Sequence, residues 1–249
     1  MVAQEQEQWD EAERCYRENL TIREFRRDYV GAASTCNQLA IVAAGAGHPD
    51  DAERWYEHAL SFPGLPSTHA AAMRNNLADL LRAEVGAGRA PASRLAEART
   101  HAEQSLRIIT KEALDLSTEP WTTLNVLAGI ADLERQPDQA RAYRRRERET
   151  FAAFGGNRYH IDRQHTAYIR AAAAATQGVA EARAAVEPLL PKLEEHGWHV
   201  ANAVRRIWDG ERDWHALSED LDAQDALLIF RILETLQGLA TILPLPDAE

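Results

Sequence analysis

Residues 37–40 of the chain are NQLA, and two similar tetrads follow, NNLA at residues 75–78 and NVLA at residues 125–128. Around each tetrad, apolar residues recur at three- and four-residue spacing, and Ala, Arg, Glu and Leu dominate, which indicates α-helix. Alternating Val, Ile and Thr runs typical of strands are absent from the sequence. The three tetrads therefore predict equivalent positions on three helices of a repeat.

A second helix is predicted after each tetrad. An alanine follows the tetrad leucine by 13 residues in the first and third copies and by 21 in the second, at Ala52, Ala140 and Ala98. The extra residues fall in the linker VGAGRAPASRL at 85–95, where a helical repeat tolerates an insertion. Each unit is thus a helix with N-x-L-A, a turn, and a helix with A-x3-[YA]-x2-[AS]-L, whose small residues permit close packing.

This pattern resembles the tetratricopeptide repeat, in the long-repeat form of kinesin light chains and bacterial signalling proteins. In that family, a leucine followed by Gly or Ala on the first helix packs against an alanine on the second, which an aromatic and another small residue follow. The best copy places Leu39, Ala40, Ala52, Tyr56 and Ala59 there. The resemblance implies an all-α fold, an α-solenoid of antiparallel helix pairs forming a right-handed superhelix.

The predicted organisation has three parts. Residues 1–155 form the repeat array, residues 156–195 form a degenerate repeat-like helix pair, and residues 196–249 form C-terminal capping helices. Ile169 and Ala182 take the key positions of the degenerate pair. The last part is similar to the end of bacterial tetratricopeptide proteins associated with NACHT/NB-ARC signalling NTPases or caspase-like proteases.

Turn residues predict several helix boundaries. Pro49 and Pro137 suit the first turn of a helix, where the missing N–H of proline costs nothing. The pair Gly155-Gly156 predicts the end of a long helix.

The first repeat lacks the beginning of its first helix when it is aligned with the second copy. Residues 2–20 match residues 42–60, so that Met1 corresponds to Ile41, after the leucine–alanine pair. A solenoid unit cannot bury its apolar face alone. We therefore expect either further residues before Met1, in a larger protein, or a second copy in a homodimer to cover the N-terminal helices.

Candidate binding residues lie beside the tetrad leucines. Asn37, Asn75 and Asn125 each precede the leucine by two residues, and Asp79 and Arg82 extend the same helix face. The resemblance implies that the first helices line a concave groove, with an asparagine ladder that binds a protein or peptide. An amide offers both a donor and an acceptor to an extended backbone. The alternative is that these asparagines only bond neighbouring helices within the array.

Composition limits the other functions. A net charge of −11 over 249 residues argues against nucleic-acid binding, which depends on neutralising phosphates. No apolar run approaches the roughly 20 residues of a membrane span, and the Glu/Gln-rich start is not a signal peptide. These features predict a cytoplasmic protein without membrane or nucleic-acid partners.

The sequence pattern predicts the burial or exposure of three groups of residues. Cys15 and Cys36 lie on apolar faces, which predicts buried thiols rather than a disulfide. The basic run RRRER at residues 144–148 and the acidic run ALSEDLDAQD at residues 216–225 are expected to be solvated.

No catalytic pattern is present. The sequence has no G-x4-GK[ST], no H-E-x-x-H and no G-x-S-x-G. Three histidines are candidate zinc ligands, His196, His199 and His215, but solvated histidines are the favoured interpretation. We therefore expect no enzyme activity and no cofactor or metal.

The sequence thus favours a protein- or peptide-binding module, the sensor or scaffold part of a larger bacterial signalling or defence protein. A stand-alone peptide-responsive regulator or adaptor is the alternative. An enzyme with an unrecognised helical active site is the third and least favoured hypothesis.

Overall fold

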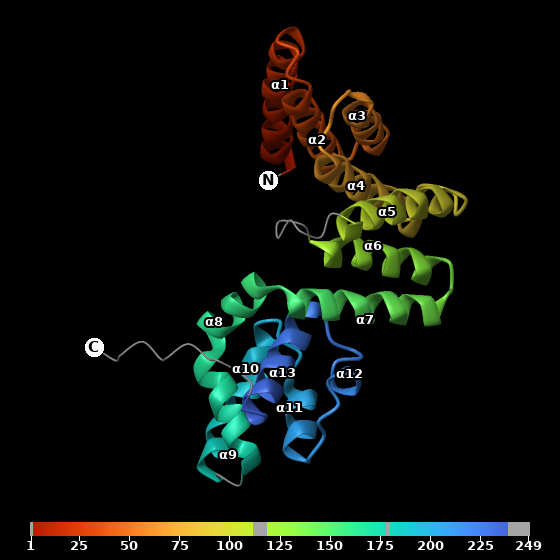
Figure 1. Ribbon diagram of the computed structural model, residues 1–249. Helices are drawn as coiled ribbons and strands as arrows, with labels where there is room; N and C mark the ends of the chain where they lie inside the picture. Colours follow the sequence, from red (N-terminus) through yellow and green to blue (C-terminus); the bar gives the residue numbers. More distant parts are fainter. Residues whose placement is uncertain (1, 112–118, 178–179, 239–249) are drawn as a thin grey trace. The chain divides into compact units, whose positions relative to one another are not determined.

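The computed structural model of the chain describes residues 2–111, 119–177 and 180–238. Within these ranges all regular elements are helical, which confirms the all-α prediction. The chain divides into two compact units, Met1–Tyr143 and Arg144–Glu249 (Figure 1).

The first unit is a succession of packed helices. Their bounds are α1 Val2–Phe25, α2 Tyr29–Gly45, α3 Pro49–Ser61, α4 Ser67–Gly86, α5 Arg94–Lys111, α6 Pro120–Leu133 and α7 Pro137–Ala153, of which α7 crosses the boundary between the units. From α1 to α6 each helix packs on the next along the chain, and α4 also contacts α2 and α6. This arrangement is that of an α-solenoid, with α2, α4 and α6 as the first helices of successive pairs (Figure 1).

The predicted repeat register is confirmed by burial. The three tetrads lie on α2, α4 and α6, and their leucines and alanines are at most 2% exposed: Leu39, Ala40, Leu77, Ala78, Leu127 and Ala128. The alanines expected opposite them on the second helices, Ala52, Ala98 and Ala140, are at most 1% exposed. Each helix pair is therefore held by small residues that let the backbones approach.

Four helix ends of the first unit share one hydrogen-bond pattern. After α2, the Gly47 N–H donates to the Ala44 carbonyl (3.1 Å) and the His48 N–H donates to the Ala43 carbonyl (2.8 Å). Gly47 has the left-handed φ of 83° that this helix stop needs. The same pattern follows α1, α4 and α6, where the left-handed residues are Arg27 (58°), Gly88 (72°) and Arg135 (59°). Two of the four stops therefore place a residue with a Cβ in a conformation that costs such a residue about 1 kcal/mol.

Replacing Arg135 by glycine should relieve this strain. We expect Arg135→Gly to raise the free energy of unfolding by up to about 1 kcal/mol, although glycine gains entropy in the unfolded chain. Arg141→Gly, in the exposed interior of α7, is the control and should lower it by about 1 kcal/mol. Urea unfolding followed by far-UV circular dichroism measures the free energy of unfolding of both variants. An equal decrease in both would show that the backbone at Arg135 is not strained.

Prolines and glycines at the helix boundaries give one confirmation and one correction. Pro49 begins α3 and Pro137 begins α7, as predicted. The long helix α7 ends at Ala153, next to the predicted stop, but the pair Gly155-Gly156 begins α8 instead of terminating α7. Phe154 makes the turn with extended backbone, and its ring folds over α8, where a Cβ on Gly156 would lie 2.6 Å from it. Glycine is needed there for the close approach of the ring.

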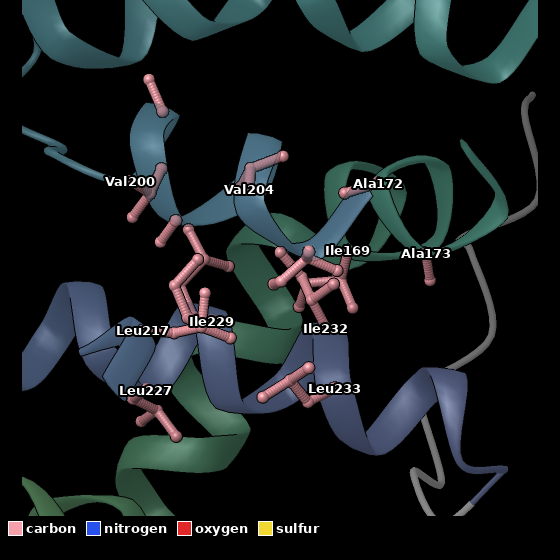
Figure 2. Close-up of a cluster of buried hydrophobic side chains, with 14 of the residues drawn as sticks. Ile169, Ala172, Ala173, Val200, Val204, Leu217, Leu227, Ile229, Ile232 and Leu233 are labelled. Atoms are coloured by element: carbon pink, nitrogen blue, oxygen red, sulfur yellow. The ribbon is translucent and has the colours of Figure 1, made fainter. Parts of the chain in front are cut away.

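The second unit has its helices packed around one core. They are α8 Gly155–Ala174, α9 Ala180–Val186, α10 Leu190–Glu195, α11 Ala201–Trp208, α12 Trp214–Leu217 and α13 Ala223–Leu236, with 3-10 turns at Ala175–Gln177 and Glu187–Leu189. Figure 2 shows Ile169 of α8, Val204 of α11, Leu217 of α12 and Ile232 of α13 in this core. Both segments that the sequence separates at residue 195 contribute to the core, and the boundary there stays a prediction.

A buried ion pair joins α8 and α13. Arg231 is 3% exposed, and its Nε and Nη2 donate to Oδ1 and Oδ2 of Asp162 at 2.8 and 2.7 Å. Glu234 also binds Arg231, and its carboxylate accepts from Arg158. Because both charges are satisfied by bidentate geometry, the pair fixes the register of the two helices.

Three predictions of burial are wrong in part. Arg148, in the basic run, is buried and donates to the carbonyls of Glu219 and Leu221 (3.3 and 3.4 Å), because the loop before α13 folds over it. Asp225, in the acidic run, is 2% exposed. Cys36 is buried as predicted, and burial raises its thiol pKa to about 12, but Cys15 is exposed.

Asp225 lies at the start of α13, and its carboxylate binds the segment before α11. Its Oδ2 accepts from the His199 N–H at 2.8 Å, and its own N–H donates to Asp222 at the start of α13. Burial raises the pKa of Asp225 from 3.8 to about 6, although the bond from His199 lowers it. Between about pH 4 and 6 the folded protein thus binds a proton that the unfolded chain releases, and the free energy of unfolding falls as the pH rises.

Asp225→Asn should remove this pH dependence. The amide oxygen still accepts from the His199 N–H but bears no charge. Near pH 8 the free energy of unfolding of the variant should therefore be at least about 1 kcal/mol higher than that of the wild type. Near pH 4 the two proteins should be alike. Urea midpoints across this range measure the effect, with the exposed Asp220→Asn as the control. A variant that is less stable than the wild type at every pH would contradict the assignment.

Candidate functional site

The five predicted binding residues lie on α2, α4 and α6, with α4 between the other two helices. Asn37 lies on α2 and is half-buried. The amide of Asn76 on α4 donates to its Oδ1 at 3.0 Å. Asn37 therefore has the role that the sequence left as the alternative, a bond to the neighbouring helix within the array.

Asn75 on α4 differs from Asn37 although it holds the same place in the repeat. Its Oδ1 is buried and has no hydrogen-bond partner. In the tetrad register the position of Asn76 corresponds to Val126 on α6, and Val126 is buried and has no side-chain donor. The next helix thus offers Asn75 no equivalent of the bond that Asn37 receives, and its acceptor remains available.

Asp79 and Arg82 form an ion pair on the same helix. Arg82 Nε and Nη2 donate to Asp79 Oδ1 at 2.9 and 2.6 Å, and both side chains are partly exposed. Arg82 also reaches α6, because a Cβ on Gly129 would lie only 2.8 Å from Arg82 Cδ. The glycine leaves room for the arginine stem, which crosses from α4 to α6.

Asn125 completes the predicted set. It lies on α6 and is exposed, and it makes an interaction within the chain. The structure therefore joins Asn37 to Asn76 and Asp79 to Arg82, and it places Asn75 with an unpaired oxygen between these pairs.

Several residues of this face escaped the sequence analysis. Asn76, Val126 and Gly129 decide the partners of Asn37, Asn75 and Arg82, and comparing the tetrads position by position would have found the first two. The second tetrad residue is Gln, Asn and Val in turn. Two exposed apolar side chains also lie on the outer two of the three helices, Ile41 on α2 (43% exposed) and Leu133 on α6 (37% exposed).

The difference between the two asparagines is testable by unfolding. Asn37→Ala should lower the free energy of unfolding by about 1–2 kcal/mol, because it leaves the half-buried amide of Asn76 without its acceptor. Asn75→Ala should change it by no more than about 0.5 kcal/mol, since it removes a group that already lacks its bond. Equal losses in the two variants, measured by urea denaturation, would show that Asn75 has a partner in solution.

A comparison with protein families supports the repeat. Residues 1–62 match the family model of the tetratricopeptide repeat. The match covers α1 to α3, with the first tetrad and Asn37. The resemblance to kinesin light chains and NACHT/NB-ARC proteins stays a prediction. No curated protein matches the chain.

The matched family bears on function at a general level. Tetratricopeptide repeats mediate protein–protein interaction, and the α-solenoid presents rows of side chains on successive helices for that purpose. In the part of the chain that the structure describes, no helix is long and apolar enough to cross a membrane. In the same residues, no three His, Cys, Asp or Glu side chains gather closely enough to hold a metal ion.

Proposed function

We propose that this chain is a protein-interaction module that binds an extended segment of a partner protein across α2, α4 and α6. The observation that carries the proposal is the unpaired Oδ1 of Asn75 in the middle of this face. An extended peptide presents backbone N–H groups that no internal bond occupies, and an amide oxygen accepts one without demanding a particular side chain. Because this oxygen is buried, a ligand reaches it only when the Asn75 side chain turns, and no hydrogen bond holds the oxygen in place against that turn.

The surrounding side chains define which segment fits. The Asp79–Arg82 pair leaves Arg82 with donors for a carbonyl or carboxylate of the ligand. Ile41 on α2 and Leu133 on α6 add exposed apolar side chains on the two outer helices. Asn125 adds an amide on α6, whereas Asn37 is engaged by Asn76 and stiffens the face instead. A peptide with apolar side chains on either side of a polar stretch matches this order.

The wider role follows from the sequence resemblances. We propose that the array is the sensor or scaffold part of a larger bacterial signalling or defence protein, that it acts in the cytoplasm, and that it has no catalytic activity of its own. The similarity of residues 196–249 to the ends of such proteins supports this role.

A display selection tests the binding proposal. Short random peptides selected on the wild-type protein should bind the double variant Asn75→Ala, Arg82→Ala at least about tenfold more weakly, a loss of about 1.4 kcal/mol. The matched control is Asn202→Ala, which removes an exposed asparagine amide on α11 in the second unit. Circular dichroism establishes that each variant is folded.

Two results would contradict the proposal. Peptides that bind wild type and double variant equally show that another surface is used. A selection that enriches no peptide above the background of the uncoated support shows that the face binds no extended segment.

A further inference from the structure

The long connection between α4 and α5 encloses a pocket with the turn between α2 and α3. The pocket has a volume of about 510 Å³. Its apolar wall contains Ala44 at the end of α2 and Leu80 and Leu81 on α4, and Ala90 in the connection faces them. The extra residues of this repeat, relative to the other two copies, therefore build one side of the pocket.

The pocket adjoins the face proposed for peptide binding. Both use α4, where successive residues turn by about 100° around the helix axis. Leu81 and Glu84, in the pocket, are thereby on nearly the opposite side of α4 from Asp79, whereas Leu80 lies one turn from Asn76. Asp50 lies on α3, outside the α2, α4 and α6 face, so a variant at Asp50 tests the pocket without changing that face.

Both arginines that line the pocket are already neutralised. Arg89 Nε and Nη2 donate to the two carboxylate oxygens of Glu84 at 2.9 and 2.7 Å. These bonds lower the pKa of Glu84, which is therefore ionised at neutral pH. Arg94 Nη2 donates to Glu53 Oε1 of α3 at 2.5 Å, so that the connection is tied to the preceding helix pair.

One further carboxylate in the pocket has no such partner. Asp50 lies in the first turn of α3 and is exposed, and no ion pair or hydrogen bond of its side chain is found among the residues that the structure describes. Three carboxylates and two guanidinium groups leave the lining with one net negative charge. An anion would have to displace Glu84 or Glu53 from their arginines and would also face Asp50. The charges of the pocket are complementary to a cation.

We propose that this pocket binds an arginine side chain presented by a partner protein. The aliphatic stem lies along Leu80 and Leu81, and the guanidinium pairs with the Asp50 carboxylate, a geometry in which two parallel N–H bonds form. A pocket of about 510 Å³ exceeds the volume of one side chain, so it also admits the backbone that carries the arginine. This size and the open, exposed rim at Asp50 and Arg89 favour a residue of a polypeptide over a free small cation.

The probe is Nα-acetyl-arginine N-methylamide, with its citrulline analogue as a neutral molecule of the same shape. Both are titrated into the ¹⁵N-labelled full chain and followed by amide chemical shifts. We expect the arginine probe to move the signals of Gly47, Asp50 and Ala90, and the citrulline probe to bind at least several-fold more weakly.

Two charge-reversal variants make the test specific. Asp50→Arg should weaken binding of the arginine probe about tenfold, because the new side chain repels the probe and competes for the pocket. Asp51→Arg makes the same change of net charge one residue away, outside the pocket, where Asp51 pairs with Arg54, and should leave the affinity within about twofold. Circular dichroism establishes that both variants are folded.

Three outcomes would overturn the proposal. The first is the absence of shifts at the pocket residues at any probe concentration, and the second is equal affinity for arginine and citrulline. The third is equal weakening by Asp50→Arg and Asp51→Arg, which would assign the binding to overall charge rather than to the pocket. None of these outcomes depends on whether the α2, α4 and α6 face binds a peptide.

Discussion

The close packing of a leucine–alanine pair on one helix against alanines on the next underlies the rest of the first unit. In the first complete pair Ala40 clusters with Ala52 and Leu39 clusters with Ala59, and all four are inaccessible to solvent. Truncating such a leucine costs about 2–5 kcal/mol because the cavity cannot close around small neighbours. The contact fixes how far apart and at what rotation the two helices lie. Every side chain at a set distance from the leucine is then placed alike on α2, α4 and α6.

Equal placement does not give equal chemistry. Asn37 and Asn75 occupy the same position on successive helices, but the residue in the position of Asn76 is Val126 in the next copy. The amide of Asn76 forms a bond to Asn37 inside the array, whereas valine has no donor and the Asn75 oxygen is unpaired. The repeat thus supplies the scaffold, and one variable position in the tetrad decides which asparagine bonds to the neighbouring helix.

Local features of the sequence were sufficient for most of the first unit. The tetrad spacing, the prolines and the leucine–alanine pairs act within one or two helices, so the pattern alone identified the helices and their register. The second unit obeys no such period. Arg148 is buried against the backbone of Glu219, and Asp225 is buried against the backbone of His199. In both cases the partner lies more than twenty residues away along the chain. No spacing in the sequence reports such contacts, because each involves a backbone group that any residue would offer.

The site shows the same division. The sequence placed Asn37, Asn75, Asn125, Asp79 and Arg82 on three successive first helices because placement follows the period, but partners follow from individual neighbours such as Asn76 and Gly129.

The insertion after α4 follows from the same constraint. Extra residues inside a helix would shift the leucine–alanine contact out of register and lose it, so the array admits them only in a connection. The connection adjoins the previous helix pair, and the new residues therefore meet the start of α3 and the end of α2 rather than open solvent. Arg94 is bound to Glu53 across this junction, which holds the connection against the array. The array can in this way gain a pocket without disturbing the contacts that define its fold.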